Sequence, residues 1–201
     1  MEKWVYLFTE GHKDMRDLLG GKGAGLAEMT RAEIPVPPGF IISTAACKAY
    51  FEAGRCLPDG LWDQVLQALK HVEGLTAKRF GDPAAPLLLS VRSGAAFSMP
   101  GMMDTVLNVG LTAAMINGPS GPETPRRFAL DCYRRLIQMF GHTVKGLDDA
   151  VFEAILEDAK RRHQCQSDTA LTAGMLADIV AAYRQAYRDA IGEDFPDDPL
   201  A

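Results

Sequence analysis

The residues best suited to chemistry lie between positions 90 and 105, where serine, glycine and other small side chains separate two apolar runs. Arg92 stands at the entry to this segment and Asp104 at its exit. Small residues let a ligand approach the backbone, and successive backbone N–H groups form a concavity that suits an anion. A guanidinium beside such a loop donates two parallel hydrogen bonds to a phosphate. The segment predicts a phosphate-binding loop between two strands, although an ordinary hairpin with a long glycine-containing connection fits the same residues.

A second cation lies in residues 20–25, where glycines surround Lys22 and a helix-forming run follows. Glycines ahead of a helix allow backbone N–H groups to meet an anion at the positive end of the helix dipole. The Walker A motif is excluded, because it requires Ser or Thr directly after Gly-Lys and this chain has Gly23 there. The pattern predicts a glycine-rich loop before a helix, and two uses of it stay open: phosphate binding through Lys22, or a plain turn with one exposed lysine.

Four arginines share the helix predicted to begin near Thr124, and they are Arg126, Arg127, Arg134 and Arg135. Four guanidinium groups have the charge to meet a polyphosphate, but a solvated helix face is the interpretation that we favour. The apolar residues of this helix are expected to face the core, and they are Phe128, Cys132, Leu136, Met139 and Phe140.

The predicted secondary structure changes near residue 112. The first part mixes helical stripes with β-forming runs, at residues 4–8, 39–42 and 105–109. The second part shows helical periodicity only. We therefore expect an α/β (α+β) fold in which residues 1–111 form one domain and residues 112–201 form a small helical subdomain.

Composition excludes several classes of protein. The chain has 201 residues and a net charge of −5, which gives no reason to expect nucleic-acid binding. We find no apolar run long enough for a membrane span and no signal peptide at the N-terminus. The four cysteines are widely spaced, which argues against a zinc site or a disulfide framework and favours a reducing, cytoplasmic setting. No metal ligands are assigned.

Several motifs together resemble the nucleotide-binding end of the ATP-grasp dikinases that use phosphoenolpyruvate. These motifs are GGKGA at residues 20–24, VPPGF at 36–40 and SVRSGA at 90–95. SMPGMMDTVLN at 98–108 and YRRLIQMFG at 133–141 resemble the pyruvate, phosphate dikinases in particular. The resemblance extends over essentially the whole chain, although Gly25 and Phe97 stand where that family is expected to have Asn and Val.

The resemblance implies a site for ATP or AMP as substrate. By analogy with the family, Lys22 and Arg92 contact the ATP phosphates and act in catalysis, and the loop at residues 98–105 covers the phosphoryl groups that are transferred. The residues that the resemblance assigns to nucleotide binding are Lys22, Arg92, Ser93, Gly94, Gly101, Met103, Asp104 and Thr105. We also expect Lys22 and Arg92 to lie close together and to face one groove.

The resemblance also implies parts that this chain lacks. Family members are several times longer, so residues 1–111 are expected to be the first lobe of an ATP-grasp domain and residues 112–201 a helical insertion. The second lobe with its Mg²⁺ ligands, a mobile phosphohistidine domain and a pyruvate-binding barrel are expected outside this chain. Alone, the chain is expected to be an inactive monomer. The alternative is a freestanding, non-catalytic module that engages a protein partner through its helices.

Overall fold

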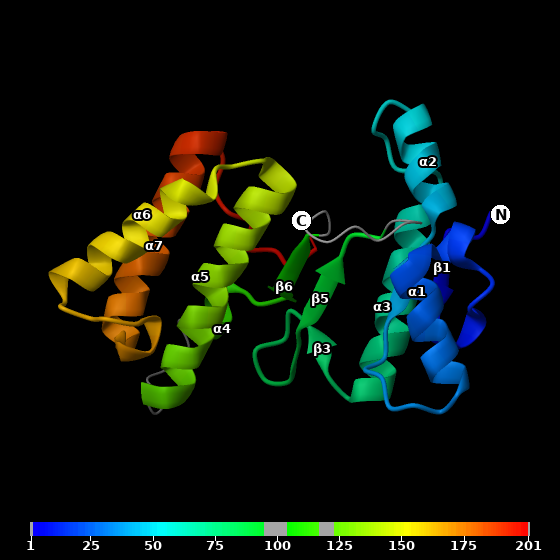
Figure 1. The fold of residues 1–201 in the computed structure, drawn as a ribbon, viewed down its shortest axis with the longest axis horizontal. Helices are drawn as coiled ribbons and strands as arrows, with labels where there is room; N and C mark the ends of the chain where they lie inside the picture. Colours follow the sequence, from blue (N-terminus) through cyan, green and yellow to red (C-terminus); the bar gives the residue numbers. More distant parts are fainter. Residues whose placement is uncertain (1, 95–103, 117–122, 201) are drawn as a thin grey trace. The chain divides into compact units, whose positions relative to one another are not determined.

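The computed structural model describes residues 2–94, 104–116 and 123–200, and it divides into two compact units (Figure 1). Unit 1 comprises Met1–Arg79 and Arg92–Asp104, and unit 2 comprises Phe80–Val91 and Thr105–Ala201. In the described part of the chain, the strands form three separate two-stranded sheets. No helix in that part is long and apolar enough to cross a lipid bilayer. The mixture of helices and short strands confirms the predicted α/β class.

Unit 1 contains an antiparallel pair of short strands, β1 (Val5–Leu7) and β2 (Phe40–Ile42). Val5 lies opposite Ile42 and Tyr6 lies opposite Ile41. Both strands fall inside the β-forming runs that the sequence predicts. The unit also holds a 3₁₀ helix and three α-helices: η1 (Phe8–Glu10), α1 (Arg16–Arg31), α2 (Thr44–Glu52) and α3 (Leu61–Thr76).

Helix α3 is fastened to β1 through Gln64. The Gln64 side-chain oxygen accepts hydrogen bonds from the backbone N–H of Trp4 at 2.8 Å and of Val5 at 3.1 Å. The Trp4 indole N–H donates to the carbonyl oxygen of Asp59 at 3.2 Å. Trp4 is buried with Leu61 and other apolar residues in the core of the unit. One end of β1 is therefore held by hydrogen bonds as well as by apolar packing.

Two further strand pairs use residues from the middle of the chain. Strand β3 (Arg79–Phe80) pairs with β4 (Pro86–Leu87), and β5 (Leu89–Arg92) pairs with β6 (Thr105–Val109). Strands β5 and β6 flank the candidate phosphate loop. This confirms the prediction that the loop connects two strands.

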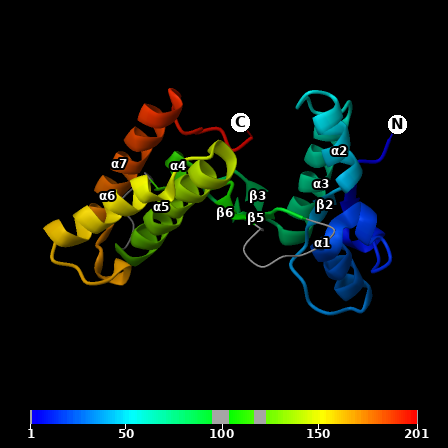
Figure 2. The same ribbon diagram turned by 45° about the horizontal axis from the view of Figure 1, so that its top comes forward.

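Unit 2 is mainly helical, as the sequence predicts. Its helices are α4 (Ala113–Ile116), α5 (Glu123–Lys145), α6 (Asp149–Arg162), the 3₁₀ helix η2 (Asp168–Ala170) and α7 (Ala173–Ile191). Figures 1 and 2 show α5, α6 and α7 packed side by side. Their core contains large side chains that solvent scarcely reaches, and these include Leu130, Tyr133, Ile137, Phe152, Leu176 and Tyr183.

Strand β6 belongs with these helices rather than with unit 1, because Val106 is buried in the helical core. The compact units therefore divide the chain at residues other than the boundary near 112 that the sequence predicts. The interpretation of residues 1–111 as a lobe and of 112–201 as an insertion stays a proposal.

The buried face of α5 differs in part from the prediction. Leu136 is buried as expected, and Cys132, Met139 and Phe140 are half-buried at the edge of the core. Phe128, in contrast, is 66% exposed, so its assignment to the core is wrong. Helix α5 packs against both α7 and β6, and these contacts place Leu130, Tyr133 and Ile137 at the centre of the buried stripe.

Phe195 lies in the segment that follows α7, and its side chain is part of this core. Its ring meets the rings of Tyr133, Phe140 and Tyr187 nearly edge to face, with centroids 5.9, 5.6 and 5.5 Å away. Such contacts add to the free energy that comes from burying an aromatic side chain. The segment after α7 is thus part of the packed unit.

We predict that Phe195→Ala lowers the free energy of unfolding by about 3–5 kcal/mol, because it leaves a cavity among three rings. The matched control is Phe128→Ala, which removes an exposed ring and should change that free energy by less than about 0.5 kcal/mol. Urea unfolding followed by far-UV circular dichroism measures both. Equal effects of the two substitutions would contradict this description of the core.

Candidate functional site

The glycine-rich segment around Lys22 is helical, not a loop. Helix α1 begins at Arg16, and the helical path is broken at Gly20 alone, which has φ 69° and ψ 166°. This conformation is open to glycine and strained for other residues. The predicted loop is therefore wrong for Gly21, Lys22 and Gly23, which form a helical turn, but the predicted start of a helix after a glycine is retained at Gly20.

This turn lies against β2. Ala24 and Ala27 have no exposed surface, and Gly23 is buried. A β-carbon placed on Gly23 would lie 3.1 Å from atoms of the Ile41 side chain, which is closer than ordinary van der Waals contact. Lys22 is half-buried, and within residues 2–94, 104–116 and 123–200 its ammonium group has no hydrogen bond or ion pair. The side chain is therefore available to a ligand as far as the described residues are concerned.

The second group of candidate residues follows β5. Arg92 is the last residue of that strand and is exposed, as are Ser93 and Gly94. The Ser93 N–H donates to the carbonyl oxygen of Asp104 at 3.1 Å, and the Ser93 hydroxyl donates to the same oxygen at 3.4 Å. These bonds close the base of the loop. Its entry and exit are thereby held together.

At the other end of the loop, Asp104 is exposed and Thr105 is half-buried at the start of β6. Gly101 and Met103 lie outside the described residues. The roles of all eight candidate residues, and the expectation that Lys22 and Arg92 face one groove, stay predictions. Among the described residues, no three His, Cys, Asp or Glu side chains lie together as a group able to hold a metal ion.

The arginines of α5 are not a uniform solvated face. Arg134 is only 3% exposed, and its guanidinium lies 2.8 Å from Asp131 and 2.6 Å from Asp168. Arg127 donates to the carbonyl oxygens of Leu171 at 2.7 Å and of Asp168 at 2.8 Å. The favoured interpretation is wrong for these two residues, because both are used to join α5 to the segment around η2.

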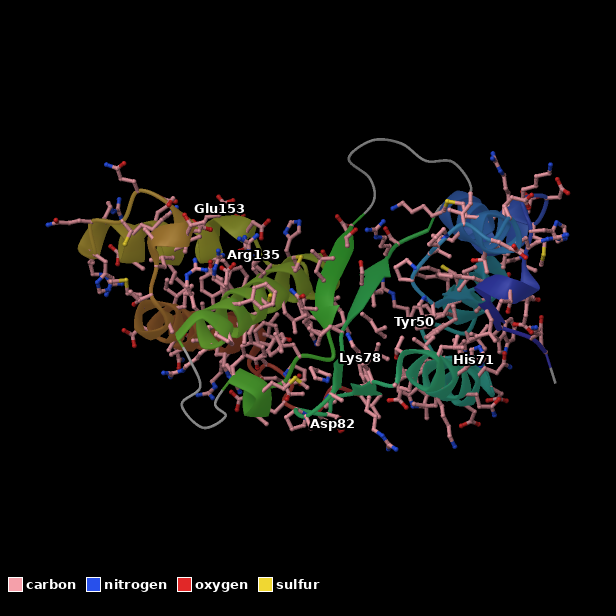
Figure 3. All side chains as sticks on the ribbon, turned by 90° about the horizontal axis from the view of Figure 1, so that it is seen from below. Tyr50, His71, Lys78, Asp82, Arg135 and Glu153 are labelled. Carbon is pink, nitrogen blue, oxygen red and sulfur yellow. The ribbon has the colours of Figure 1, made fainter. Side chains whose placement is uncertain are left out.

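A cavity of about 480 Å³ in unit 2 is lined by residues of this network and by residues of α6. Figure 3 labels two of the lining residues, Arg135 on α5 and Glu153 on α6. The cations that line it are paired: Arg135 lies 3.2 Å from Asp131, and Lys160 lies 2.5 Å from Glu157 and 3.2 Å from Asp168. Because carboxylates already balance these charges, the cavity is poorly suited to a polyphosphate.

Asp168 accepts hydrogen bonds from three residues of this network. Partial burial by itself raises the pKa of its carboxyl group, but the hydrogen bond from Lys160 and the charge of Arg134 outweigh burial and hold the pKa below its ordinary value. Asp168 is therefore charged in the folded chain over a wider pH range than in the unfolded chain.

Comparison with known proteins gives a family model and several curated relatives that this chain resembles. The family model described as the AMP/ATP-binding domain of pyruvate phosphate dikinase matches residues 16–74, which include Lys22. The chloroplastic pyruvate, phosphate dikinase of Flaveria pringlei is 51% identical over 98% of this chain, and the Rhizobium meliloti enzyme is 49% identical over 99%. A chloroplastic enzyme of Oryza sativa subsp. japonica is 53% identical over 95%.

The chain spans about a fifth of the length of these relatives, namely 21%, 23% and 20%. The aligned region extends well beyond the segment that the family model matches, so it also takes in the loop after β5. None of these matches supports the alternative of a non-catalytic binding module.

The Asp168 network predicts a specific dependence of stability on pH. A carboxyl group with a lowered folded-state pKa contributes stability above its unfolded pKa, about 3.9, and this contribution is lost as the pH falls through the folded value. We predict that the free energy of unfolding falls with pH below about 4 more steeply in the parent chain than in Asp168→Asn. Urea unfolding at a series of pH values measures this, and equal slopes would contradict it.

Proposed function

This chain belongs to the pyruvate, phosphate dikinase family and matches its AMP/ATP-binding region, and from this we propose that Lys22 and Arg92 bind the phosphates of ATP. The observation that carries the proposal is the position of Lys22. It follows the break at Gly20, at the start of a helical segment, and it lies inside the stretch that the AMP/ATP-binding family model matches. The positive end of a helix and an ammonium group both favour an anion there.

Arg92 is proposed as the second cation. It ends β5 at the base of a loop whose two ends are joined by the hydrogen bonds from Ser93 to Asp104. Ser93, Gly94, Gly101, Met103, Asp104 and Thr105 are proposed to supply polar groups and close backbone approach to the same phosphates. Cations and backbone donors stabilise the charge that spreads over phosphoryl oxygens during transfer.

We propose that the longer protein carries out the reaction after which the family is named. ATP, phosphate and pyruvate would be converted to AMP, pyrophosphate and phosphoenolpyruvate, through a histidine on a mobile domain and a pyruvate-binding barrel outside this chain. Among the described residues, no three His, Cys, Asp or Glu side chains lie together, so no Mg²⁺ site is assigned to them. We therefore derive no step through a metal and assign any Mg²⁺ ligands to other parts of the protein.

The cellular compartment of the protein is also a proposal. The Flaveria and Oryza relatives are named as chloroplastic, whereas the name of the Rhizobium relative carries no such word. All four cysteines are free thiols, and Cys47 and Cys56 are exposed. Free, exposed thiols fit a reducing compartment, and we propose the cytoplasm. We further propose that the chain on its own is monomeric and catalyses no turnover.

We predict that the 201-residue chain binds ATP with a Kd in the millimolar range, equivalent to about −4 kcal/mol, because few solvent-exposed charge contacts are present. Lys22→Ala and Arg92→Ala should each weaken binding by up to about fivefold, which corresponds to the ~1 kcal/mol of an exposed charge pair. Titration with ATP, followed by amide chemical shifts in NMR, measures affinities in this range.

The matched controls are Lys70→Ala and Arg126→Ala, which remove exposed cations that are not assigned to the site. They should leave the Kd unchanged, and none of the four substitutions should alter the free energy of unfolding by more than about 0.5 kcal/mol. Loss of ATP affinity in the controls alone, or unchanged affinity in both Lys22→Ala and Arg92→Ala, would overturn the proposed function.

A further inference from the structure

The contact between α1 and β2 is close at one residue in particular. A β-carbon on Gly23 would lie 3.1 Å from Cδ1, 3.1 Å from Cγ1 and 3.2 Å from Cγ2 of Ile41. Three atoms of one side chain therefore fill the space where a larger residue would project. Gly25, two residues further along the same helix, is different: a β-carbon there would meet no atom of the described residues within 4 Å.

The partner in this contact has little freedom to move. Ile41 is the central residue of β2 and lies opposite Tyr6 of β1, so its backbone is held in the strand pair. Its β-branched side chain is restricted at χ1. On the helix side, Ala24 and Ala27 have no exposed surface, which opposes a rotation of α1 that would relieve crowding at Gly23. An added methyl group would therefore require a shift of a few tenths of an ångström between the helical turn and the Ile41 side chain.

Lys22 lies on this turn, next to Gly23 and two residues after the break at Gly20. Since neighbouring helical residues are separated by a rise of only about 1.5 Å, a displacement of Gly23 carries the Lys22 backbone with it. Charged contacts to phosphate depend on distance and direction, so such a displacement changes the position of the Lys22 ammonium group relative to the ligand.

We infer that Gly23 and Ile41 are positioning residues for the phosphate contact of Lys22: the closeness of α1 to β2 at this pair sets where Lys22 stands. The inference rests on the proposed function and extends it to two residues that touch no phosphate themselves. Gly23 thus has a role set by packing, in addition to the conformational freedom for which glycines near phosphates are usually valued.

The test is Gly23→Ala in the 201-residue chain, with ATP as the titrated ligand. We expect ATP binding to weaken about as much as in Lys22→Ala, by up to fivefold. In a background that already carries Lys22→Ala, Gly23→Ala should cause no further loss, because the side chain that it displaces is gone. Gly25→Ala is the matched control and should leave the Kd unchanged.

Rescue provides the second part of the test. Gly23→Ala/Ile41→Ala removes the atoms that crowd the new methyl group, and it should restore most of the lost affinity. If Gly23→Ala alone does not fold, as judged by circular dichroism, Gly23→Ala/Ile41→Val removes the Cδ1 contact and should show a smaller loss of affinity than Lys22→Ala.

The outcomes separate this inference from the proposed function. Unchanged ATP affinity in Lys22→Ala would overturn the proposed function, and the inference with it. Weakened binding in Lys22→Ala with normal binding in Gly23→Ala would overturn the inference only. An equal loss caused by Gly23→Ala with and without Lys22 would assign Gly23 a purely structural role and would also overturn the inference.

Discussion

The absence of side-chain bulk on one face of α1 is the constraint on which unit 1 depends. Gly23 lets the helix lie close to β2, where Ile41 fills the space above it, and Ala24 and Ala27 on the same helix are fully buried. Larger residues at these positions would force the helix away from the strand pair, because the pair is itself held in place by α3 through Gln64. Lys22 shares the same turn. The packing of the unit and the placement of its candidate ligand-binding residue are thus parts of one arrangement.

Unit 2 depends on a different interaction, the burial of a charged group. Arg134 is almost fully buried, which is tolerated because Asp131 and Asp168 accept hydrogen bonds from it. Removing one member of such a pair is costly, because the remaining charge stays buried without its partner. The carbonyl oxygen of Asp168 also accepts from Arg127, and its carboxylate also meets Lys160. One residue between α6 and α7 therefore ties those helices to α5.

Much of the fold can be predicted from the sequence because it depends on neighbours along the chain. The β-forming runs at 4–8 and 39–42, the two strands that flank the candidate loop and the helical second half all appear in the structure. The errors arise where distant segments meet. Glycines around Lys22 indicate a loop by local preference, yet packing on β2 keeps them helical and leaves the bend to Gly20. Helical periodicity places Phe128 in the core, yet α7 and β6 cover other residues of α5.

For the candidate site, too, some features can be predicted from the sequence and others only from the tertiary structure. The sequence alone indicates Lys22, Arg92 and the loop after Arg92 as candidates, and it carries the resemblance to the dikinases, because these features lie in short contiguous motifs. Only the tertiary structure distinguishes Gly23, where a β-carbon would crowd Ile41, from Gly25, where a β-carbon would meet none of the described residues, and Arg134, which is buried, from Arg135, which is half-exposed. Each of these pairs is of one residue type on one helix. What separates their members is contact with strands and helices remote in sequence, which a local pattern does not contain.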